Sequence, residues 1–305
     1  MRRALPFGKA LPPVAVELIR ILSDLHFGDR ASRVRSLPSL QPLFVGADRI
    51  VFNGDSLETR SAPGGPRPAA LRRHFLEFVR REAPRCLLLT GNHDADISEV
   101  HCLDLLGGQM FVTHGEVFFD DLVPWSPQRP HLGECYRRQL DLLSPEERES
   151  LEARLVACKR ASAQEVLPAE PHPHHRWRRT MRTVQKFWPP RRALAMMQAW
   201  RVLPDRVAEV VKHHRPGAHF AVVGHTHLPG VWTRDNLVVI NTGSFCPPFG
   251  AYAVDVSPRE VVVRRIRRSQ GRFVLGRVVA RFALASEPDA VPDVSPFSAG
   301  LASSP

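Results

Sequence analysis

Short apolar runs recur along the chain, and each stops abruptly at polar, turn-forming residues. Buried strands of an α/β sheet have this pattern, because both faces are covered and functional loops leave at the carboxyl ends of the strands. The runs are Val16–Leu22, Arg49–Phe52, Cys86–Leu89, Met110–Val112 and Phe220–Val223. The sequence therefore predicts an α/β fold in which the loops at the strand ends carry reactive side chains.

Between the second and third runs, the chain changes to helical periodicity. Residues Ala69–Arg81 place Leu71, Phe75, Phe78 and Val79 at the spacing of one helix face. This pattern predicts a crossover helix, so the first half of the chain is interpreted as a β-α-β unit.

A different pattern begins near Trp125 and lasts to Pro216. Ser144 stands before Pro145, which is a strong helix start because serine caps the first turn and proline suits its first position. Helices are expected over Ser144–Lys159, over Trp177–Phe187 and over Arg192–His213, the last interrupted at Pro204. Residues 125–216 are therefore predicted to be a helical insertion or cap.

Strand-like alternation returns after the last apolar run. Strands are expected over Leu237–Ile240, Tyr252–Val256, Val261–Ile266 and Phe273–Phe282, and they would close a second sheet. Residues 286–305 are rich in Pro, Ser and Ala and are expected to be a disordered tail. The predicted organisation is a main domain over residues 1–124 and 217–285, with the insertion and the tail outside it.

The net charge of +11 favours anionic partners such as phosphorylated metabolites, nucleic acid or an acidic membrane surface. Nearly all of this charge is arginine, and an arginine bias can equally reflect codon composition. Five scattered cysteines without a C-x-x-C pair indicate neither a disulfide framework nor a structural zinc site. No signal peptide or spanning run is evident. We therefore expect a cytoplasmic location, with peripheral contact to the inner membrane left open.

Reactive side chains follow all five of these strand ends. They are Asp24 and His26; Asp55; Asn92, His93 and Asp94; His114; and His225 and His227. Each group alone is also what ordinary turns and loops contain. Their occurrence together, in order and each after an apolar run, favours one shared site.

These residue types suit a pair of metal ions. Asp24 and His26 are two residues apart, as are His225 and His227, so a strand period of two would send both members of each pair to one side. The carboxylate of Asp55 has two oxygens and can bridge two cations about 3.5 to 4 Å apart. Imidazole, carboxylate and amide ligands together suit manganese, iron or zinc.

The ordered motifs Ser-Asp-Leu-His, Gly-Asp-x-x-Glu, Gly-Asn-His-Asp, His-Gly and Gly-His-Thr-His resemble those of the calcineurin-like metallophosphoesterase superfamily. The resemblance covers positions 16–120 and 218–256. It implies a four-layer α/β/β/α sandwich of two sheets flanked by helices, and the activity of a metal-dependent phosphoester hydrolase.

Carried over by position, the resemblance implies one divalent metal ion held by Asp24, His26 and His227 and a second held by Asn92, His114 and His225, with Asp55 bridging them. Manganese is expected first, with iron and zinc as alternatives. A hydroxide held between the two cations would attack phosphorus in line. His93 would stabilise the transition state or protonate the leaving oxygen, and Asp94 would set the tautomer of His93.

Within the superfamily, the motifs Asp-Leu-His, Gly-Asp-x-x-Glu, His-Gly-Glu and Gly-His-Thr-His-x-Pro resemble the bacterial UDP-2,3-diacylglucosamine pyrophosphatases of lipid A synthesis. Those enzymes commonly carry arginine at the position of His93, and the insertion here is atypical in length. A phosphorylated small molecule or a lipid-linked phosphate is the expected substrate, without a choice among monoester, diester and pyrophosphate.

Two other functions stay open. The insertion mixes aromatic side chains with arginines (Trp177, Phe187, Trp188, Trp200; Arg176, Arg178, Arg179, Arg182, Arg191, Arg192), which can grip an amphipathic substrate or a nucleic-acid strand, or form a core with a solvated basic face. A nuclease is therefore one alternative, and a non-catalytic scaffold, which the complete ligand set disfavours, is the other. His172, His174 and His175 are expected in an exposed loop rather than in a third metal site.

Overall fold

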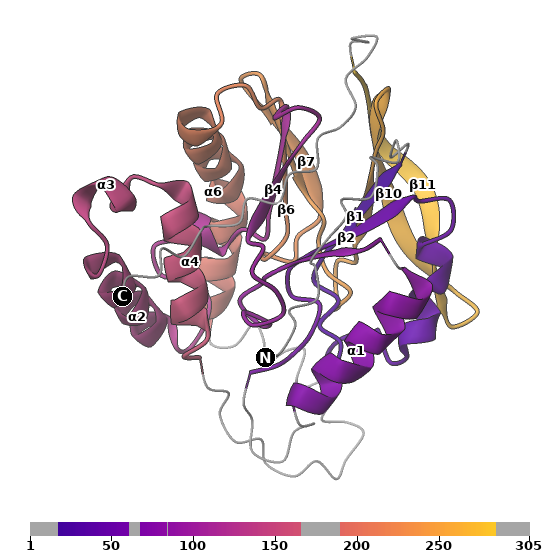
Figure 1. Cartoon of the computed structure of the whole chain (residues 1–305), viewed down its shortest axis with the longest axis horizontal. Coiled ribbons are helices and arrows are strands. Elements are labelled where there is room, and N and C mark those ends of the chain that lie inside the picture. Colours follow the sequence, from indigo (N-terminus) through magenta and orange to yellow (C-terminus); the bar gives the residue numbers. More distant parts are fainter. Residues whose placement is uncertain (1–17, 61–67, 84, 166–189, 285–305) are drawn as a thin grey trace, which may run out of the picture.

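The computed structural model describes residues 18–60, 68–83, 85–165 and 190–284. Its strands form two sheets that lie between helices (Figure 1). The first sheet has the order β11-β10-β9-β1-β2-β3. Its strands are β11 (Arg272–Ala283), β10 (Glu260–Ser269), β9 (Tyr252–Val256), β1 (Ile19–Leu22), β2 (Arg49–Asn53) and β3 (Leu87–Leu89).

The second sheet has the order β4-β5-β6-β8-β7. Its strands are β4 (Cys102–Leu105), β5 (Met110–Thr113), β6 (Phe220–Val223), β8 (Leu237–Asn241) and β7 (Gly230–Arg234). β5, β6 and β8 run parallel, as β1, β2 and β3 do in the first sheet. The strand predictions are confirmed, but β4 and β7 were not anticipated because both are short edge strands with polar residues.

A common core lies between the two sheets. Ile19, Ile21 and Val51 contribute to it from the first sheet, and Val112 and Val222 contribute from the second. The alternate residues of these strands face outward and are also covered, which is why the runs are almost continuously apolar, with Arg20 of β1 as a buried charged exception. The central strands of both sheets are thus buried on two faces, whereas β11 and β7 are partly exposed.

Helices cover the outer face of each sheet, with α1 on one side and α2, α4 and α6 on the other (Figure 1). The helices are α1 (Pro68–Glu82), α2 (Arg129–Asp141), α3 (Pro145–Arg148), α4 (Leu151–Ser162) and α6 (Pro190–His214), with short 3-10 helices η1 at Leu37–Leu43 and η2 at Glu116–Phe118. Phe75 of α1 packs with Phe52 of β2, and Leu155 of α4 packs in one cluster with Phe111 of β5. The result is a four-layer α/β/β/α sandwich, which confirms the predicted fold class.

The structure corrects the helices expected within residues 125–216. α2 was not anticipated, and the helix expected from Ser144 is two helices, because the side chain of Ser150 accepts a backbone hydrogen bond and caps a second start. α6 continues through Pro204 without interruption. Pro204 is buried beside Leu203 on the inner face of α6, and tertiary packing there outweighs the lost backbone hydrogen bond.

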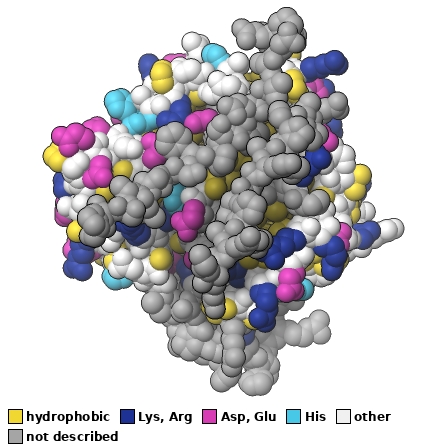
Figure 2. Space-filling model, in the orientation of Figure 1, with side chains coloured by type: hydrophobic (Ala, Val, Ile, Leu, Met, Phe, Trp, Pro, Cys, Tyr) yellow, Lys and Arg dark blue, Asp and Glu magenta, His cyan; other side chains and the backbone are white. Residues whose placement is uncertain are grey.

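Some predictions fall on residues outside those described. They are the helix over Trp177–Phe187, the histidines His172, His174 and His175, the tail over residues 286–305, and the aromatic and arginine side chains of the insertion that precede residue 190 (drawn in grey in Figure 2). The limits of the insertion therefore stay a prediction. Within the described ranges, no helix combines the length and the apolar character needed to cross a membrane.

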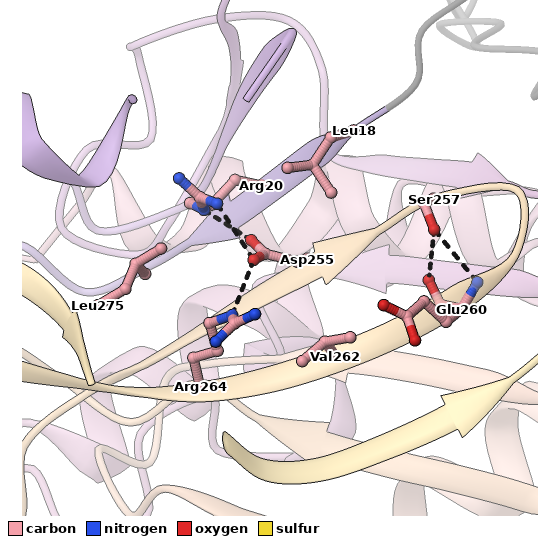
Figure 3. A pocket seen from close by; sticks show the side chains of 8 residues that line it. All are labelled: Leu18, Arg20, Asp255, Ser257, Glu260, Val262, Arg264 and Leu275. Carbon is pink, nitrogen blue, oxygen red and sulfur yellow. Dashed lines mark hydrogen bonds and ion pairs between the residues drawn. The ribbon is translucent and has the colours of Figure 1, made fainter. Parts of the chain in front are cut away.

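A pocket of about 270 Å³ opens against the first sheet (Figure 3). Arg20 donates to Asp255 at 2.6 Å and to the carbonyl of Leu43 at 2.7 Å, and Arg264 donates to the same carboxylate at 3.3 Å. These paired charges join β1, β9 and β10. None of the eight residues that line the pocket belongs to the predicted site.

Candidate metal centre

Asp55 follows β2 and lies where loops from both sheets converge. Its Oδ2 is 3.3 Å from His114 Nε2. The Nε2 atoms of His26 and His93 each lie 3.7 Å from the same oxygen. These three imidazoles follow β1, β3 and β5 at the carboxyl ends of the strands. Folding therefore brings three ring nitrogens to one carboxylate oxygen.

His227 forms a first group with Asp24 and His26. Its Nε2 lies 3.3 Å from Asp24 Oδ1 and 2.9 Å from His26 Nε2. Together with Asp55, these residues offer ligand atoms that all lie within 4.8 Å of one another. Two ligands bound at about 2.1 Å to one cation are roughly 3 Å apart when they meet at a right angle. The spacing fits one shared cation.

His225, Asn92 and His114 form a second group. His225 Nδ1 lies 2.9 Å from Asn92 Oδ1, and its Nε2 donates to the carbonyl of Leu122 at 2.8 Å. His114 Nδ1 donates to the carbonyl of Asn53 at 3.0 Å, and its Nε2 has no hydrogen-bond partner among the described residues. In each ring the carbonyl fixes which nitrogen keeps its proton, so the other nitrogen is the one available to a metal.

The charges of the two groups balance one another in the metal-free protein. Burial disfavours the imidazolium of His114, but the carboxylates of Asp55 and Asp24 outweigh burial and raise its pKa to about 10. Burial and the charge of His114 lower the pKa of His225 to about 4. Burial also opposes ionisation of Asp24 and Asp55, yet the surrounding imidazoles hold both pKa values well below the usual range. In the metal-free protein, the protonated ring of His114 therefore supplies positive charge next to Asp24 and Asp55, as a bound cation would.

Five of the predicted ligands have a left-handed backbone. Their φ angles are 52° at Asp24, 48° at His26, 50° at Asp55, 66° at His225 and 62° at His227. Non-glycine residues rarely adopt this conformation, and the strain persists where surrounding contacts hold it, often at functional sites. The strand-period argument is thereby corrected: Asp24 and His26 lie beyond β1, and left-handed turns rather than strand pleating aim their side chains.

Two glycines of the motifs are required by close approach. A Cβ atom at Gly91 would lie 2.1 Å from the backbone nitrogen of Asp55, and one at Gly224 would lie 2.2 Å from Asp24 Oδ2. Any side chain at either position would displace a ligand.

His93 reaches the centre from the loop after β3. Its Nδ1 is 2.8 Å from Glu58 Oε2, and Glu58 is paired with Arg60 at 2.7 Å. Burial and Arg60 oppose protonation of His93, but Asp55 and Glu58 prevail and raise its pKa above the ordinary value. The side chain of His93 is 15% exposed, whereas that of Asp55 is 1% exposed. His93 can therefore touch both the centre and an incoming substrate.

The structure corrects the role predicted for Asp94. Its carboxylate accepts hydrogen bonds of 2.7 to 3.1 Å from the backbone N–H groups of Asp55, Ser56, Leu57 and Gly91. Burial and the charge of Asp55 raise the pKa of Asp94 to about 6. Asp94 therefore shapes the loop that carries Asp55. Glu58 orients His93 instead. Glu58 is the last residue of the motif Gly-Asp-x-x-Glu, and this position could have identified it from the sequence.

A second carboxylate missed by the site prediction is Glu116, in the motif His-Gly-Glu. It is fully buried and forms a possible metal-binding group with His114 and His225, with ligand atoms within 4.8 Å of one another. Its ion-pair partner is Lys159 of α4.

The first group is the more open side of the centre. The side chain of His227 is 33% exposed, whereas Asn92, His114 and His225 of the second group are all buried. Trp200 of α6 donates through Nε1 to the carbonyl of Thr226 at 2.8 Å, and its ring lies 5.2 Å from that of Phe249. One member of the predicted aromatic set thus stands directly beside the motif Gly-His-Thr-His.

No family model matches the sequence, and the comparison with curated proteins found no match either. Among solved structures, the chain is similar to YfcE, a phosphoesterase from E. coli, at 16% identity over 88% of this chain and 100% of that chain, with a TM-score of 0.39. It is similar to a dimetal phosphatase from Danio rerio at 12% identity over 86% and 99%, with a TM-score of 0.39. It is also similar to Vps29 from Chaetomium thermophilum at 12% identity over 89% and 97%, with a TM-score of 0.41. At these identities and TM-scores, the likeness by itself assigns neither a family nor an activity to this chain.

Proposed function

We propose that this chain is a two-metal phosphoester hydrolase of the calcineurin-like metallophosphoesterase superfamily. The proposal rests on one observation: the Nε2 atoms of His26, His93 and His114 all lie within 3.7 Å of Asp55 Oδ2. Asp24, His26 and His227 would hold one divalent cation, Asn92, His114 and His225 would hold the second, and Asp55 would bridge them. Manganese is proposed first, with iron and zinc as alternatives, because all three accept this mixture of ligands.

The chain's own residues would bind the phosphate and move a proton. The two cations, when bound, would supply Lewis acidity and neutralise charge on the phosphoryl oxygens. His93 presents Nε2 toward Asp55 while Glu58 holds Nδ1. Its raised pKa keeps more of the imidazolium present at neutral pH. His93 is therefore placed to protonate the leaving oxygen or to stabilise the transition state.

The surroundings of His227 favour a substrate with an apolar part. Trp200 and Phe249 form an aromatic contact next to the more open ligand group. A lipid-linked phosphate such as UDP-2,3-diacylglucosamine, which the motif resemblance suggests, is thus the finer proposal.

The test is hydrolysis of bis-p-nitrophenyl phosphate, p-nitrophenyl phosphate and UDP-2,3-diacylglucosamine by chelated protein, before and after manganese is restored. Manganese-dependent turnover that is lost in Asp55→Asn supports the hydrolase. A matched control is Asp235→Asn, because Asp235 also has a left-handed backbone, with φ of 50°, but lies between β7 and β8 on the surface. Turnover of the generic esters alone would remove the lipid-linked substrate. Absence of both bound metal and turnover would refute the hydrolase and favour a scaffold.

A further inference from the structure

Lys159 of α4 is a buried cation that contacts two ligand-bearing loops. It is only 5% exposed. Its Nζ donates to the carbonyl of Thr90 at 2.9 Å and forms an ion pair with the carboxylate of Glu116. α4 lies within the segment predicted as an insertion, far along the chain from Thr90. A single side chain therefore links this helical segment to two loops of the main domain.

Both loops belong to the second ligand group. Thr90 lies two residues before Asn92, and Glu116 lies two residues after His114. Glu116 also groups with His114 and His225, and its Oε2 is buried without a hydrogen-bond partner among the described residues. The Lys159 contacts thus fix the distance between the loops that carry Asn92 and His114.

Burying this lysine is unfavourable unless its charge is paired, and removal of either partner leaves the other charge buried and unpaired. Lys212 of α6, the other lysine within the described ranges, is exposed and needs no such partner. The buried pair is therefore a costly feature placed where two ligand loops meet, and outer contacts of this kind orient metal ligands.

We propose that Lys159 is a positioning residue for the second cation, acting through Thr90 and Glu116. The docking of α4 then sets the relative placement of Asn92, His114 and His225. This inference rests on the proposed two-metal function and extends it. The helical segment becomes part of the metal centre, in addition to any role as a cover over the substrate.

The experiment measures manganese binding to the full-length chain by calorimetry and by electron paramagnetic resonance, in which a coupled pair of ions differs from a single ion. Lys159→Met should weaken the second equivalent of manganese about tenfold or more, as loss of outer contacts does elsewhere, while the first equivalent is retained. The coupled signal should give way to that of a single ion. Lys212→Met is the matched control and should bind both equivalents as the wild type does.

A double variant separates positioning from fold stability. Lys159→Met with Glu116→Gln leaves no unpaired buried charge, so its unfolding midpoint should recover toward that of the wild type, whereas the second equivalent should stay weak. Recovery of manganese affinity together with stability would overturn the inference, as would wild-type binding in Lys159→Met. Wild-type protein that binds two ions and hydrolyses nothing would refute the proposed function but leave the inference intact. Wild-type protein that binds fewer than two ions would overturn both.

Discussion

His225 Nδ1 lies 2.9 Å from the side-chain oxygen of Asn92, although both atoms act as acceptors. The ring nitrogen is an acceptor because the lowered pKa of His225, about 4, leaves one proton at neutral pH, and the carbonyl of Leu122 holds that proton on Nε2. Two lone-pair donors at this separation are what a shared cation requires. The contact supports a metal site independently of the carboxylates.

Replacement of this histidine tests the second group directly. We expect His225→Ala to lose manganese from the second position and to reduce hydrolysis to background, while the circular dichroism spectrum stays that of a folded protein. The reason is that no other described side chain supplies the Nδ1 atom next to Asn92. Metal analysis and turnover should fall together, and full activity in the variant would remove His225 from the centre.

Loss of the His93 side chain should separate catalysis from metal binding. His93→Ala is expected to keep both manganese ions, because His93 belongs to neither predicted ligand set and its Nδ1 is held by Glu58, although the two residues group with His26. Turnover should fall by roughly 100-fold or more, the usual contribution of a positioned acid or base. Equal losses of metal and turnover would show that His93 is a ligand instead.

The Glu58 carboxylate should set the pH dependence of His93. It helps to raise the pKa of His93, so the imidazolium of the wild type survives to higher pH than that of Glu58→Gln. If the imidazolium is the active form, the alkaline fall of turnover should move to lower pH in the variant. The profile of kcat against pH measures this shift. An unchanged alkaline limb, or a shift to higher pH, would contradict the assignment.

Binding of metal should release protons. The pKa of His114 is raised to about 10 from an ordinary value of 6.5, so the ring is protonated in the metal-free protein at neutral pH and must lose a proton to bind a cation. The same shift stabilises the metal-free fold fully below the unfolded pKa, and this contribution is lost as pH rises through about 10. Because a proton and manganese compete for the His114 ring, manganese affinity should increase as the pH rises toward about 10.

Calorimetry in two buffers of different ionisation enthalpy counts these protons. A binding enthalpy that does not depend on the buffer would mean that no proton leaves, and His114 would then be neutral before metal arrives. The control is His214→Gln, because His214 lies at the end of α6 and belongs to none of the metal-binding groups.

Local pattern was sufficient for the strands of an α/β fold and for the loops that carry the candidate ligands, whereas the four-layer sandwich was implied by the motif resemblance. Apolar runs such as Phe220–Val223 reveal strands because a sheet covered on both faces excludes polar residues from them. The helix α1 was equally clear from the spacing of Phe75 and Phe78. The helix break before Leu151 and the continuous helix through Pro204 could not be predicted in this way. Capping and tertiary packing compete there with weak local preferences.

The sequence by itself determined which residue types follow each strand, and therefore that Asp55, His114 and His225 could meet at one edge of the fold. Only the tertiary structure decided the hydrogen-bond and ion-pair partners of the residues around these ligands. In the folded protein, Asp94 accepts hydrogen bonds from backbone N–H groups, His93 pairs with Glu58, and Lys159 is buried in an ion pair with Glu116. The physical reason is that hydrogen bonds between residues distant in sequence depend on backbone turns and side-chain directions, which no local pattern of apolar and polar residues specifies.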